Sequence, residues 1–402
     1  MAFSNTAALR LELERALPER PFTVEFWDGS RVAATVNPAP TFFIRSPRAL
    51  AHVVRAPGEL GLGRAYAQGL IETDDLDAAL LLVDSFQAPR LSPGTIARLG
   101  LGLLRATGLT LPPAVPQTEL RLRGERHTVA RDRRAVRHHY DAGNDFFKLF
   151  LDPSMTYSCA YWRGGATTLE EAQKAKLDLI CKKLDLQPGE TLLDVGCGWG
   201  SMALNAARER QVKVLGISLS EPQVQEARRR ASEQGLSELV EFEVRDYREL
   251  GDRQFDAISS IGMVEHVGEE RIDLYMSTLH GLLRPGGRLL NHGIAKLADF
   301  DTRDEGAFSE RFVFPDGVPL PLSRIAKAME RTNLVVQHVE GIGPDYALTI
   351  TEWIKRYEER YDEAVKLAGE ERARVWKLYL RAARQGFTTN WATVFQVLAK
   401  RL

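Results

Sequence analysis

Hydrophobic and polar positions alternate in short stretches near the start of the chain. Residues 22–27 and 31–36 show the two-residue period of strands, and Asp28-Gly29 between them is typical of a hairpin turn. Residues 41–44 form a further apolar run. Apolar residues at helical spacing follow at 47–54, 60–69 and 76–86. This mixture predicts a small α+β unit.

From residue 191 onward, apolar runs alternate with amphipathic stretches. Such alternation indicates a parallel sheet with right-handed crossovers and helices on both faces. We expect a mostly parallel seven-stranded sheet, the last strand lying at an edge. The expected strands are 191–195, 212–217, 240–244, 255–261, 288–292, 335–341 and 391–398. The expected helices are 169–184 (capped by Thr168), 201–210, 221–234 (capped by Ser220), 271–283, 350–368 and 370–384.

The first strand of this alternation ends in a glycine-rich turn. Gly196, Gly198 and Gly200 stand at every second position, where the lack of a Cβ lets a ligand approach the backbone. The dinucleotide fingerprint has the spacing Gly-x-Gly-x-x-Gly and an acidic residue after the second strand, whereas this chain has Gly-x-Gly-x-Gly and Ser218. The spacing therefore favours a different nucleoside ligand.

Three further features narrow that ligand. Asp194 precedes the turn, Asp246-Tyr247 follows the third strand, and Arg-Pro-Gly-Gly precedes the fifth. The set resembles class I S-adenosylmethionine-dependent methyltransferases. In this interpretation Asp246 accepts from the adenine amine, and Tyr247 or Ile261 covers the ring.

Composition sets outer limits on the function. The 402 residues carry 53 Lys and Arg against 54 Asp and Glu, which argues against a nucleic-acid-binding protein. Three cysteines without metal-ligand spacing indicate reduced thiols and no metal site. We find no signal peptide in residues 1–14 and no apolar run long enough to span a membrane. We therefore expect a cytoplasmic protein that meets any membrane from the side.

Two segments between the halves are candidates for membrane contact. Proline residues punctuate 87–117, and the apolar stretch 96–105 is either a surface-lying helix or a linker helix packed on the neighbouring domain. Residues 121–137 then hold seven arginines, which favour an anionic lipid surface unless they are only a solvated face. No aromatic residue is interleaved there before Tyr140, so nucleic acid is the weaker interpretation.

Several motifs together resemble the cyclopropane-fatty-acyl-phospholipid synthase family of bacteria. The first is His139-Tyr-Asp-Ala-Gly-Asn-Asp145, whose aromatic residues we expect to pack over a pocket. The others are Tyr157-Ser-Cys-Ala-Tyr-Trp162, Leu193-Asp-Val-Gly-Cys-Gly-Trp-Gly200, Gly262-Met-Val-Glu-His-Val-Gly268 and Phe387-Thr-Thr-Asn-Trp391. The resemblance covers about residues 125–402, and more loosely the N-terminal part. It implies domains at 1–118 (an accessory, lipid-binding domain with a linker) and 119–402 (the catalytic domain).

The resemblance implies a defined reaction. The methyl group of S-adenosylmethionine is transferred to a cis double bond of an unsaturated phospholipid acyl chain, and the cation then loses a proton as the cyclopropane ring closes. A bound bicarbonate is the implied base, and Glu265 beside it is either protonated or orients a donor. The implied cradle consists of Cys159, Glu265, His292, the backbone of Ile294, and Tyr346.

The same resemblance implies the cofactor contacts and a homodimer at the inner face of the membrane. Ser218 stands where many members have threonine, and Pro222 precedes one of the contacts. Without the resemblance, Cys181, Cys197, Cys159 and His266 are ordinary packing residues. The implied contacts are Tyr157, Ser158, Gly196, Gly198, Ser218, Leu219, Gln223, Asp246, Tyr247 and Ile261.

Three alternatives remain open at this point. The same methyl transfer can yield a 10-methylene branch in place of a ring. A small-molecule N-methyltransferase uses a similar catalytic domain. A non-catalytic lipid-binding protein with a relic cofactor fold is the third, and the intact cradle argues against it.

Overall fold

A computed structural model describes residues 6–86, 89–107, 114–140, 142–297 and 307–402. The chain forms two compact units. The first comprises the described residues within 1–120, 304–313 and 369–385, and the second comprises those within 121–303, 314–368 and 386–402. The division near residue 120 is close to the predicted boundary after residue 118. The two later segments belong with the N-terminal unit, which the sequence pattern did not predict.

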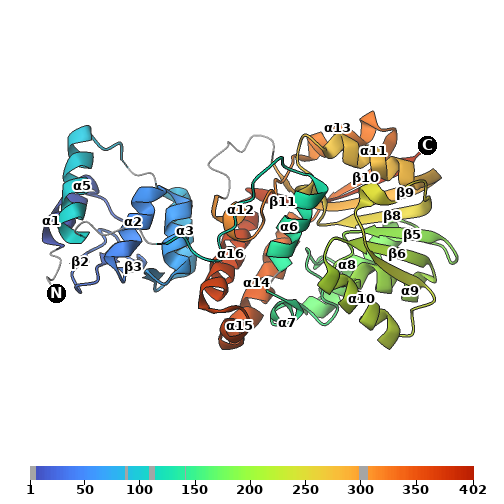
Figure 1. Ribbon diagram of the computed structural model, residues 1–402, viewed down its shortest axis with the longest axis horizontal. Coiled ribbons are helices and arrows are strands. Elements are labelled where there is room, and N and C mark those ends of the chain that lie inside the picture. Colours follow the sequence, from blue (N-terminus) through green and yellow to red (C-terminus); the bar gives the residue numbers. More distant parts are fainter. Residues whose placement is uncertain (1–5, 87–88, 108–113, 141, 298–306) are drawn as a thin grey trace. The chain divides into compact units, whose positions relative to one another are not determined.

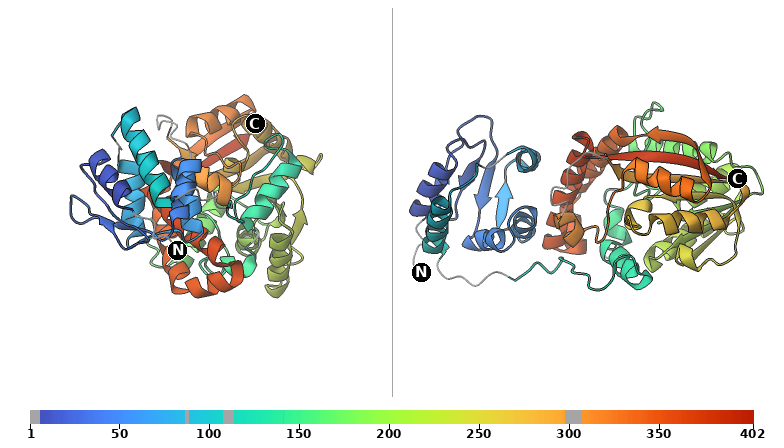
Figure 2. Two further views of the ribbon diagram at one scale, coloured as in Figure 1. Left: turned by 60° about the vertical axis from the view of Figure 1, so that its left-hand side comes forward. Right: turned by 90° about the horizontal axis from the view of Figure 1, so that it is seen from above.

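The N-terminal unit is built on a four-stranded sheet with the order β2-β1-β3-β4 (the blue part of Figures 1 and 2). β1 pairs antiparallel with β2 and parallel with β3, and β4 is antiparallel to β3. The predicted hairpin is present, although its strands are shorter than expected. The strands are β1 (Thr23–Glu25), β2 (Arg31–Val32), β3 (Thr41–Ile44) and β4 (Ile71–Thr73). The helices are α1 (Ala7–Ala16), α2 (Pro47–Arg55), α3 (Glu59–Ala67), α4 (Leu76–Ser85), α5 (Pro93–Thr107), α12 (Ala307–Phe312) and α16 (Glu370–Thr388).

The apolar stretch at 96–105 lies within α5, and its inner face is packed. Ala106 is fully buried in the core of this unit, and the Gly102 backbone approaches Leu9 of α1. Arg98 on the same helix pairs with Glu12 at 2.9 Å. The alternative of a helix packed on the neighbouring domain is therefore correct for this face. The outer face leaves three apolar side chains exposed: Ile96, Leu101 and Leu104.

The second unit contains the predicted seven-stranded sheet, with the order β10-β11-β9-β8-β5-β6-β7. The strands β9, β8, β5, β6 and β7 run parallel, and β11 is antiparallel to both β9 and β10. The prediction that the last strand lies at an edge is wrong, because β11 lies between β9 and β10 and the edge strand is β10. The strands are β5 (Thr191–Val195), β6 (Lys213–Ser218), β7 (Val240–Val244), β8 (Phe255–Ile261), β9 (Leu283–Lys296), β10 (Leu334–Gly341) and β11 (Ala392–Arg401).

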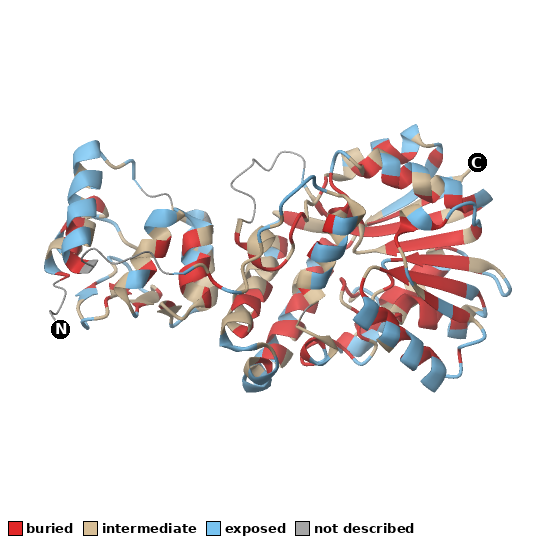
Figure 3. Cartoon of the chain, in the orientation of Figure 1, coloured by how far each residue is buried: buried red, intermediate tan, exposed pale blue. Residues whose placement is uncertain are grey.

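Helices cover both faces of this sheet, as predicted (Figure 1). Apolar side chains of α11 and α13 form the core on one face, and those of α8, α9 and α10 form it on the other. The central strands β5, β6 and β8 are buried almost throughout, whereas the edge strands β7 and β10 have exposed positions (Figure 3). These helices are α8 (Leu169–Lys183), α9 (Ser201–Arg210), α10 (Glu221–Glu233), α11 (Ile272–Leu282) and α13 (Leu322–Arg331).

Two details of the helices in this unit differ from the sequence predictions. The stretch 350–368, expected as one helix, lies in two helices, α14 (Gly343–Glu359) and α15 (Tyr361–Ala368), which are separated at Arg360. Thr168 caps α8 as predicted, with Glu171 completing a capping box, but the Ser220 side chain makes no cap hydrogen bond to α10. The elements not yet named are α6 (Val129–Tyr140), α7 (Asn144–Phe147) and the 3₁₀ turns η1 (Tyr247–Glu249) and η2 (Val264–His266).

Within the described ranges, no helix is both long enough and apolar enough to cross a bilayer.

Candidate active site

The glycine-rich turn leads directly from β5 into α9. Gly196, Gly198 and Gly200 have φ values of 75°, 54° and 84°, a left-handed conformation that favours glycine. A Cβ added to Gly200 would lie 2.7 Å from Cζ of Phe242 in the core. Small residues here therefore let the N-terminus of α9 approach the sheet, with backbone N–H groups directed at the carboxyl end of the strands.

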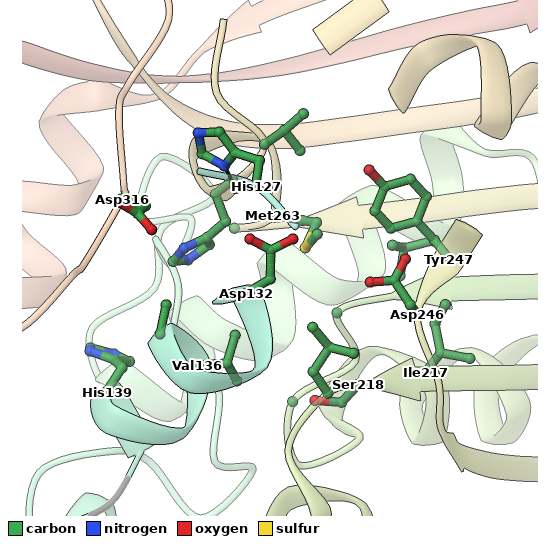
Figure 4. A pocket seen from close by; sticks show the side chains of 18 of the residues that line it. His127, Asp132, Val136, His139, Ile217, Ser218, Asp246, Tyr247, Met263 and Asp316 are labelled. Carbon is green, nitrogen blue, oxygen red and sulfur yellow. Dashed lines mark hydrogen bonds between the residues drawn. The ribbon is translucent and has the colours of Figure 1, made fainter. Parts of the chain in front are cut away.

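A pocket opens over this turn, between the strand ends and α6. Figure 4 shows Asp132, Val136 and His139 of α6 on one side, and on the other Ser218 at the end of β6 with Asp246 and Tyr247 at the η1 turn that follows β7. Seven of the ten residues implied as cofactor contacts line it: Gly196, Gly198, Ser218, Leu219, Gln223, Asp246 and Tyr247.

The other three implied contacts lie close to this lining. Ile261 ends β8 just before Gly262 and Met263, which line the pocket. The Tyr157 ring is stacked on His139 of the lining, with centroids 5.6 Å apart. Ser158 follows Tyr157 and is buried, with 8% of its surface exposed.

The N-terminal half of the pocket-facing side of α6, with Asp132 and Val136, was not predicted from the sequence. Asp132, Val136 and His139 are spaced by four and three residues, so one helix face carries all three. The arginines of this segment were interpreted only as a charged surface, although the helical spacing of residues 132, 136 and 139 indicates a buried helix face. The expected packing of His139 and Tyr140 over a pocket is confirmed, and Asp141 of the same motif lies outside the described residues.

Arg248 connects the two sides of the pocket. Its Nε donates to Asp246 Oδ1 and its Nη2 to Asp246 Oδ2, both at 2.7 Å. Nη2 also donates to Asp132 Oδ2 on α6 at 2.8 Å, and Nη1 donates to the carbonyl of His127 at 3.1 Å. The carboxylate expected to accept from adenine is thus held in one orientation. Each of its oxygens has two lone pairs, so an acceptor position remains on Oδ2.

The Ser218 hydroxyl donates to Gln223 Oε1 at 3.0 Å. The departure from threonine therefore keeps a hydrogen bond that orients Gln223. Pro222, which precedes Gln223, accepts from Asn144 through its carbonyl at 3.2 Å. The side chain of Gln223 is buried at the pocket edge, with 2% of its surface exposed.

Two buried charges lie beneath the turn. Asp194 accepts from Ser259 at Oδ1 (2.8 Å), while its Oδ2 has no hydrogen-bond partner in the described part of the protein. Burial raises the pKa of Asp194 to about 6. Lys176 of α8 is fully buried, donates to Ser158 Oγ at 2.9 Å, and has its pKa lowered by burial to about 8. Lys176 was not among the site residues predicted from the sequence.

These groups fit S-adenosylmethionine. The unpartnered Asp194 Oδ2 at the strand end can accept from an ammonium such as that of the methionine part. The glycine turn leaves room for a ligand to contact the protein backbone. Asp246 offers a hydrogen-bond acceptor at the far side of the pocket. The residues present therefore match the charge pattern of that cofactor.

The implied cradle is distributed over β9, η2 and the segments beside them. Glu265 Oε1 accepts from the Ile294 backbone N–H at 3.1 Å, and its buried Oε2 has no hydrogen-bond partner among the residues described. Burial raises the pKa of Glu265 to about 7. The Ile294 N–H was expected to serve a bound anion, and in this structure it serves Glu265.

Two further cradle residues, His292 and Cys159, are also buried. His292 is 2% exposed, and burial lowers its pKa well below the usual range. Cys159 is fully buried and lies 3.6 Å from the carbonyl of Ile342, the residue that precedes α14. Because burial raises the pKa of Cys159 well above its usual value, this cysteine is a neutral thiol and not a nucleophile.

Aromatic rings connect the cofactor side to the cradle side. Trp353 of α14 lies between Tyr157 and Tyr346, with ring centroids at 5.2 Å and 5.8 Å. Tyr346 also packs against Phe387 at 4.6 Å. Such a wall excludes water and presents π density, which favours a transient cation.

This chain is similar in sequence and in fold to several known proteins. Residues 127–397 match the family described as "Mycolic acid cyclopropane synthetase". A "Probable fatty acid methyltransferase" of Mycobacterium tuberculosis is 37% identical over 98% of this chain and 94% of its own length. A "Cyclopropane-fatty-acyl-phospholipid synthase" of Escherichia coli is 35% identical over 86% of this chain and 84% of its own.

A solved structure extends this similarity to the cofactor. It is a mycolic acid cyclopropane synthase in complex with SAH and CTAB, 33% identical, with a TM-score of 0.64 over 67% of this chain and 98% of that one. The chain therefore belongs to the mycolic acid cyclopropane synthetase family and is an S-adenosylmethionine-dependent methyltransferase.

Proposed function

We propose that this protein transfers the methyl group of S-adenosylmethionine to a cis double bond of an unsaturated phospholipid acyl chain and closes a cyclopropane ring. The observation that carries this proposal is the buried carboxyl group of Glu265. Its Oε2 is unpartnered in the described structure, and the same unit contains the aromatic wall of Tyr157, Trp353 and Tyr346. An alkene is a weak nucleophile, so its methylation requires a dry site that tolerates positive charge.

S-adenosylmethionine would supply the methyl group, and bicarbonate would accept the proton that the new methyl group loses on ring closure. Asp194 Oδ2 would hold the ammonium of the methionine part, and the glycine turn would let that part approach the backbone. Asp246 would accept from the adenine amine in the orientation that Arg248 imposes. Trp353 and the two tyrosines beside it exclude water from the reacting carbons.

Glu265 is the residue suited to an anion. With a pKa of about 7, a substantial fraction of its carboxyl groups is protonated near neutral pH and can donate from Oε2. The Ile294 N–H fixes the other oxygen, so the donor direction is set. His292 supplies a second donor, and Tyr346 and the Cys159 thiol complete the cradle.

Lipid contact is part of the proposal. Six of the seven arginines at 121–137 are exposed, whereas Arg131 is buried in a bidentate pair with Asp316 at 2.5 and 2.7 Å. An anionic surface attracts each basic residue near it by about 1 kcal/mol. We propose that these arginines bind the inner face of the membrane peripherally, and that the enzyme works there as a homodimer.

The product test uses vesicles of dioleoyl phospholipid with S-adenosylmethionine and bicarbonate. Proton NMR of the extracted lipid should show upfield cyclopropane signals. Vinylidene signals would instead assign the 10-methylene product, and the absence of both would overturn lipid methylation. Vesicle co-sedimentation that does not depend on anionic lipid would contradict the membrane contact, and sedimentation equilibrium tests the dimer.

The residue assignment has its own test. We expect Glu265→Gln and His292→Ala to abolish turnover while S-adenosylhomocysteine binding, measured by calorimetry, is nearly kept. Glu270→Gln is the matched control, because Glu270 is an exposed carboxylate five residues further along. A comparable loss of cofactor affinity in the first two variants would mean that the cradle is misassigned.

A further inference from the structure

Three side chains form a hydrogen-bonded chain behind the cradle. Lys183 lies in the last turn of α8, and Gln396 of β11 stands directly opposite His292 of β9 in the antiparallel ladder. Gln396 is fully buried and His292 is 2% exposed. Side chains opposite each other in such a ladder project from the same face, so Gln396 and His292 are neighbours by register.

Lys183 fixes the orientation of the Gln396 amide. Its Nζ lies 2.7 Å from Gln396 Oε1, and an ammonium can only donate. The atom facing it must therefore be the amide oxygen, because a rotated amide would put an NH₂ group against the charge. Glu340 pairs with the same Nζ at 2.5 Å and holds the ammonium in place.

The fixed amide then determines which nitrogen of His292 carries the proton. Gln396 Nε2 lies 3.2 Å from His292 Nδ1, and an amide NH₂ can only donate. Nδ1 must therefore accept, which requires it to be unprotonated. A neutral imidazole in this environment carries its proton on Nε2.

We propose that Lys183 and Gln396 are positioning residues that hold His292 as the neutral Nε2–H tautomer. His292 then acts in the reaction as a hydrogen-bond donor toward an anion and not as the base that removes the proton. This inference rests on the proposed function only in placing His292 at the reacting anion. The surroundings agree with it, because burial and the charges of Lys176 and Lys183 all disfavour the imidazolium.

The tautomer can be measured without turnover. Long-range ¹H–¹⁵N correlation spectra of the full-length ¹⁵N-labelled protein distinguish the two tautomers, and His292→Gln identifies the signal among the eight histidines. We expect the Nε2–H pattern for His292 from pH 6 to pH 9. An Nδ1–H pattern or an imidazolium in the unmodified protein would overturn the proposal.

Gln396→Glu is the sharpest variant because it keeps the size of the side chain and its pairing with Lys183. A carboxylate opposite Nδ1 accepts instead of donating, so we expect His292 to change to the Nδ1–H or doubly protonated form. Turnover on dioleoyl phospholipid should fall by about 100-fold or more, since an imidazole held in the wrong tautomer is catalytically poor. Affinity for S-adenosylhomocysteine should change less than about threefold.

Lys183→Met tests the first contact of the chain. With the Gln396 amide free to rotate, we expect both neutral tautomers of His292 to be populated. Turnover should fall by about 10-fold, the lower end of the loss of activity seen when a hydrogen-bonding partner that orients a site residue is removed. Lys182→Met is the matched control, because that lysine is the exposed neighbour on the same helix. Unchanged turnover in both Gln396→Glu and Lys183→Met would overturn the role in the reaction. If the unmodified enzyme showed the Nε2–H signature but no lipid turnover, the proposed function would fail and the tautomer assignment would stand.

Discussion

Lys176 gives the most direct quantitative prediction. It is fully buried, and its one hydrogen bond given by the structure goes to the Ser158 hydroxyl. Burial lowers the pKa of Lys176 from 10.5 to about 8. Each pKa unit corresponds to 1.36 kcal/mol, so keeping this ammonium charged costs the folded state about 3 kcal/mol near pH 7.

Lys176→Met should therefore stabilise the protein at neutral pH. Methionine has nearly the same length and removes the buried charge, while the lost hydrogen bond to Ser158 costs about 1 kcal/mol. We expect the free energy of unfolding at pH 7 to rise by about 2 kcal/mol. The gain would be obtained at the expense of the charge beneath the cofactor turn, a common trade-off at functional sites.

The pH dependence distinguishes this cause from improved packing. The folded-state pKa is the lower one, so the unfolded state binds more protons between about pH 8 and 10.5, and the stability of the unmodified protein rises with pH there. Urea denaturation of both proteins from pH 7 to pH 10 should show the advantage of Lys176→Met shrinking by more than half. Lys174→Met on the exposed side of α8 should show no such trend. A pH-independent difference between Lys176→Met and the unmodified protein would refute the reasoning.

Three other changes have definite expected outcomes. Glu265→Gln should be more stable than the unmodified protein by up to about 3 kcal/mol above pH 7, because burial raises the pKa of Glu265 from 4.5 to about 7. Urea denaturation should show this advantage disappearing as the pH falls to 4.5, and an advantage that persists there would contradict it. Gly200→Ala should destabilise by at least about 2 kcal/mol, since its methyl group meets a core ring at 2.7 Å and its φ is 84°. It should also weaken S-adenosylhomocysteine binding in calorimetry, and unchanged stability would refute the close packing. Arg131→Met removes the bidentate partner of the buried Asp316 and leaves it only the longer pair with the exposed Arg126 at 3.5 Å, so we expect a loss of about 3 kcal/mol in urea denaturation. The exposed Arg134→Met should lose little, and equal losses would contradict the pairing.

Much of the catalytic fold is predictable from local pattern. The strand runs and the glycine turn specify β5 to β9 because parallel strands buried on both faces read as short apolar runs between helices. The position of β11 is different. Residues 391–398 have the pattern of a strand, but that pattern is the same for an edge strand and an interior one. Only pairing with β9 and β10, both distant in sequence, decides between them.

Site residues that lie within sequence motifs could be predicted. Residues that are buried by segments distant in sequence could not. A lysine on a helix usually faces solvent, and Lys176 is buried because the segment containing Ser158 lies over it. The arginine content of 121–137 hid the pocket-facing side of α6. Gln396 has no motif of its own, and its importance follows only from its register opposite His292.

The interior position of β11 has a consequence for the order in which the enzyme matures. During synthesis β9 and β10 are made before β11, and because β11 lies between them and pairs with both, β10 joins the sheet only when β11 is in place. His292 gains its Gln396 partner at that same step. The nascent chain therefore has its cofactor turn and its parallel strands before it has the hydrogen-bonding arrangement around His292. Completion of the sheet and acquisition of the oriented imidazole are a single late event.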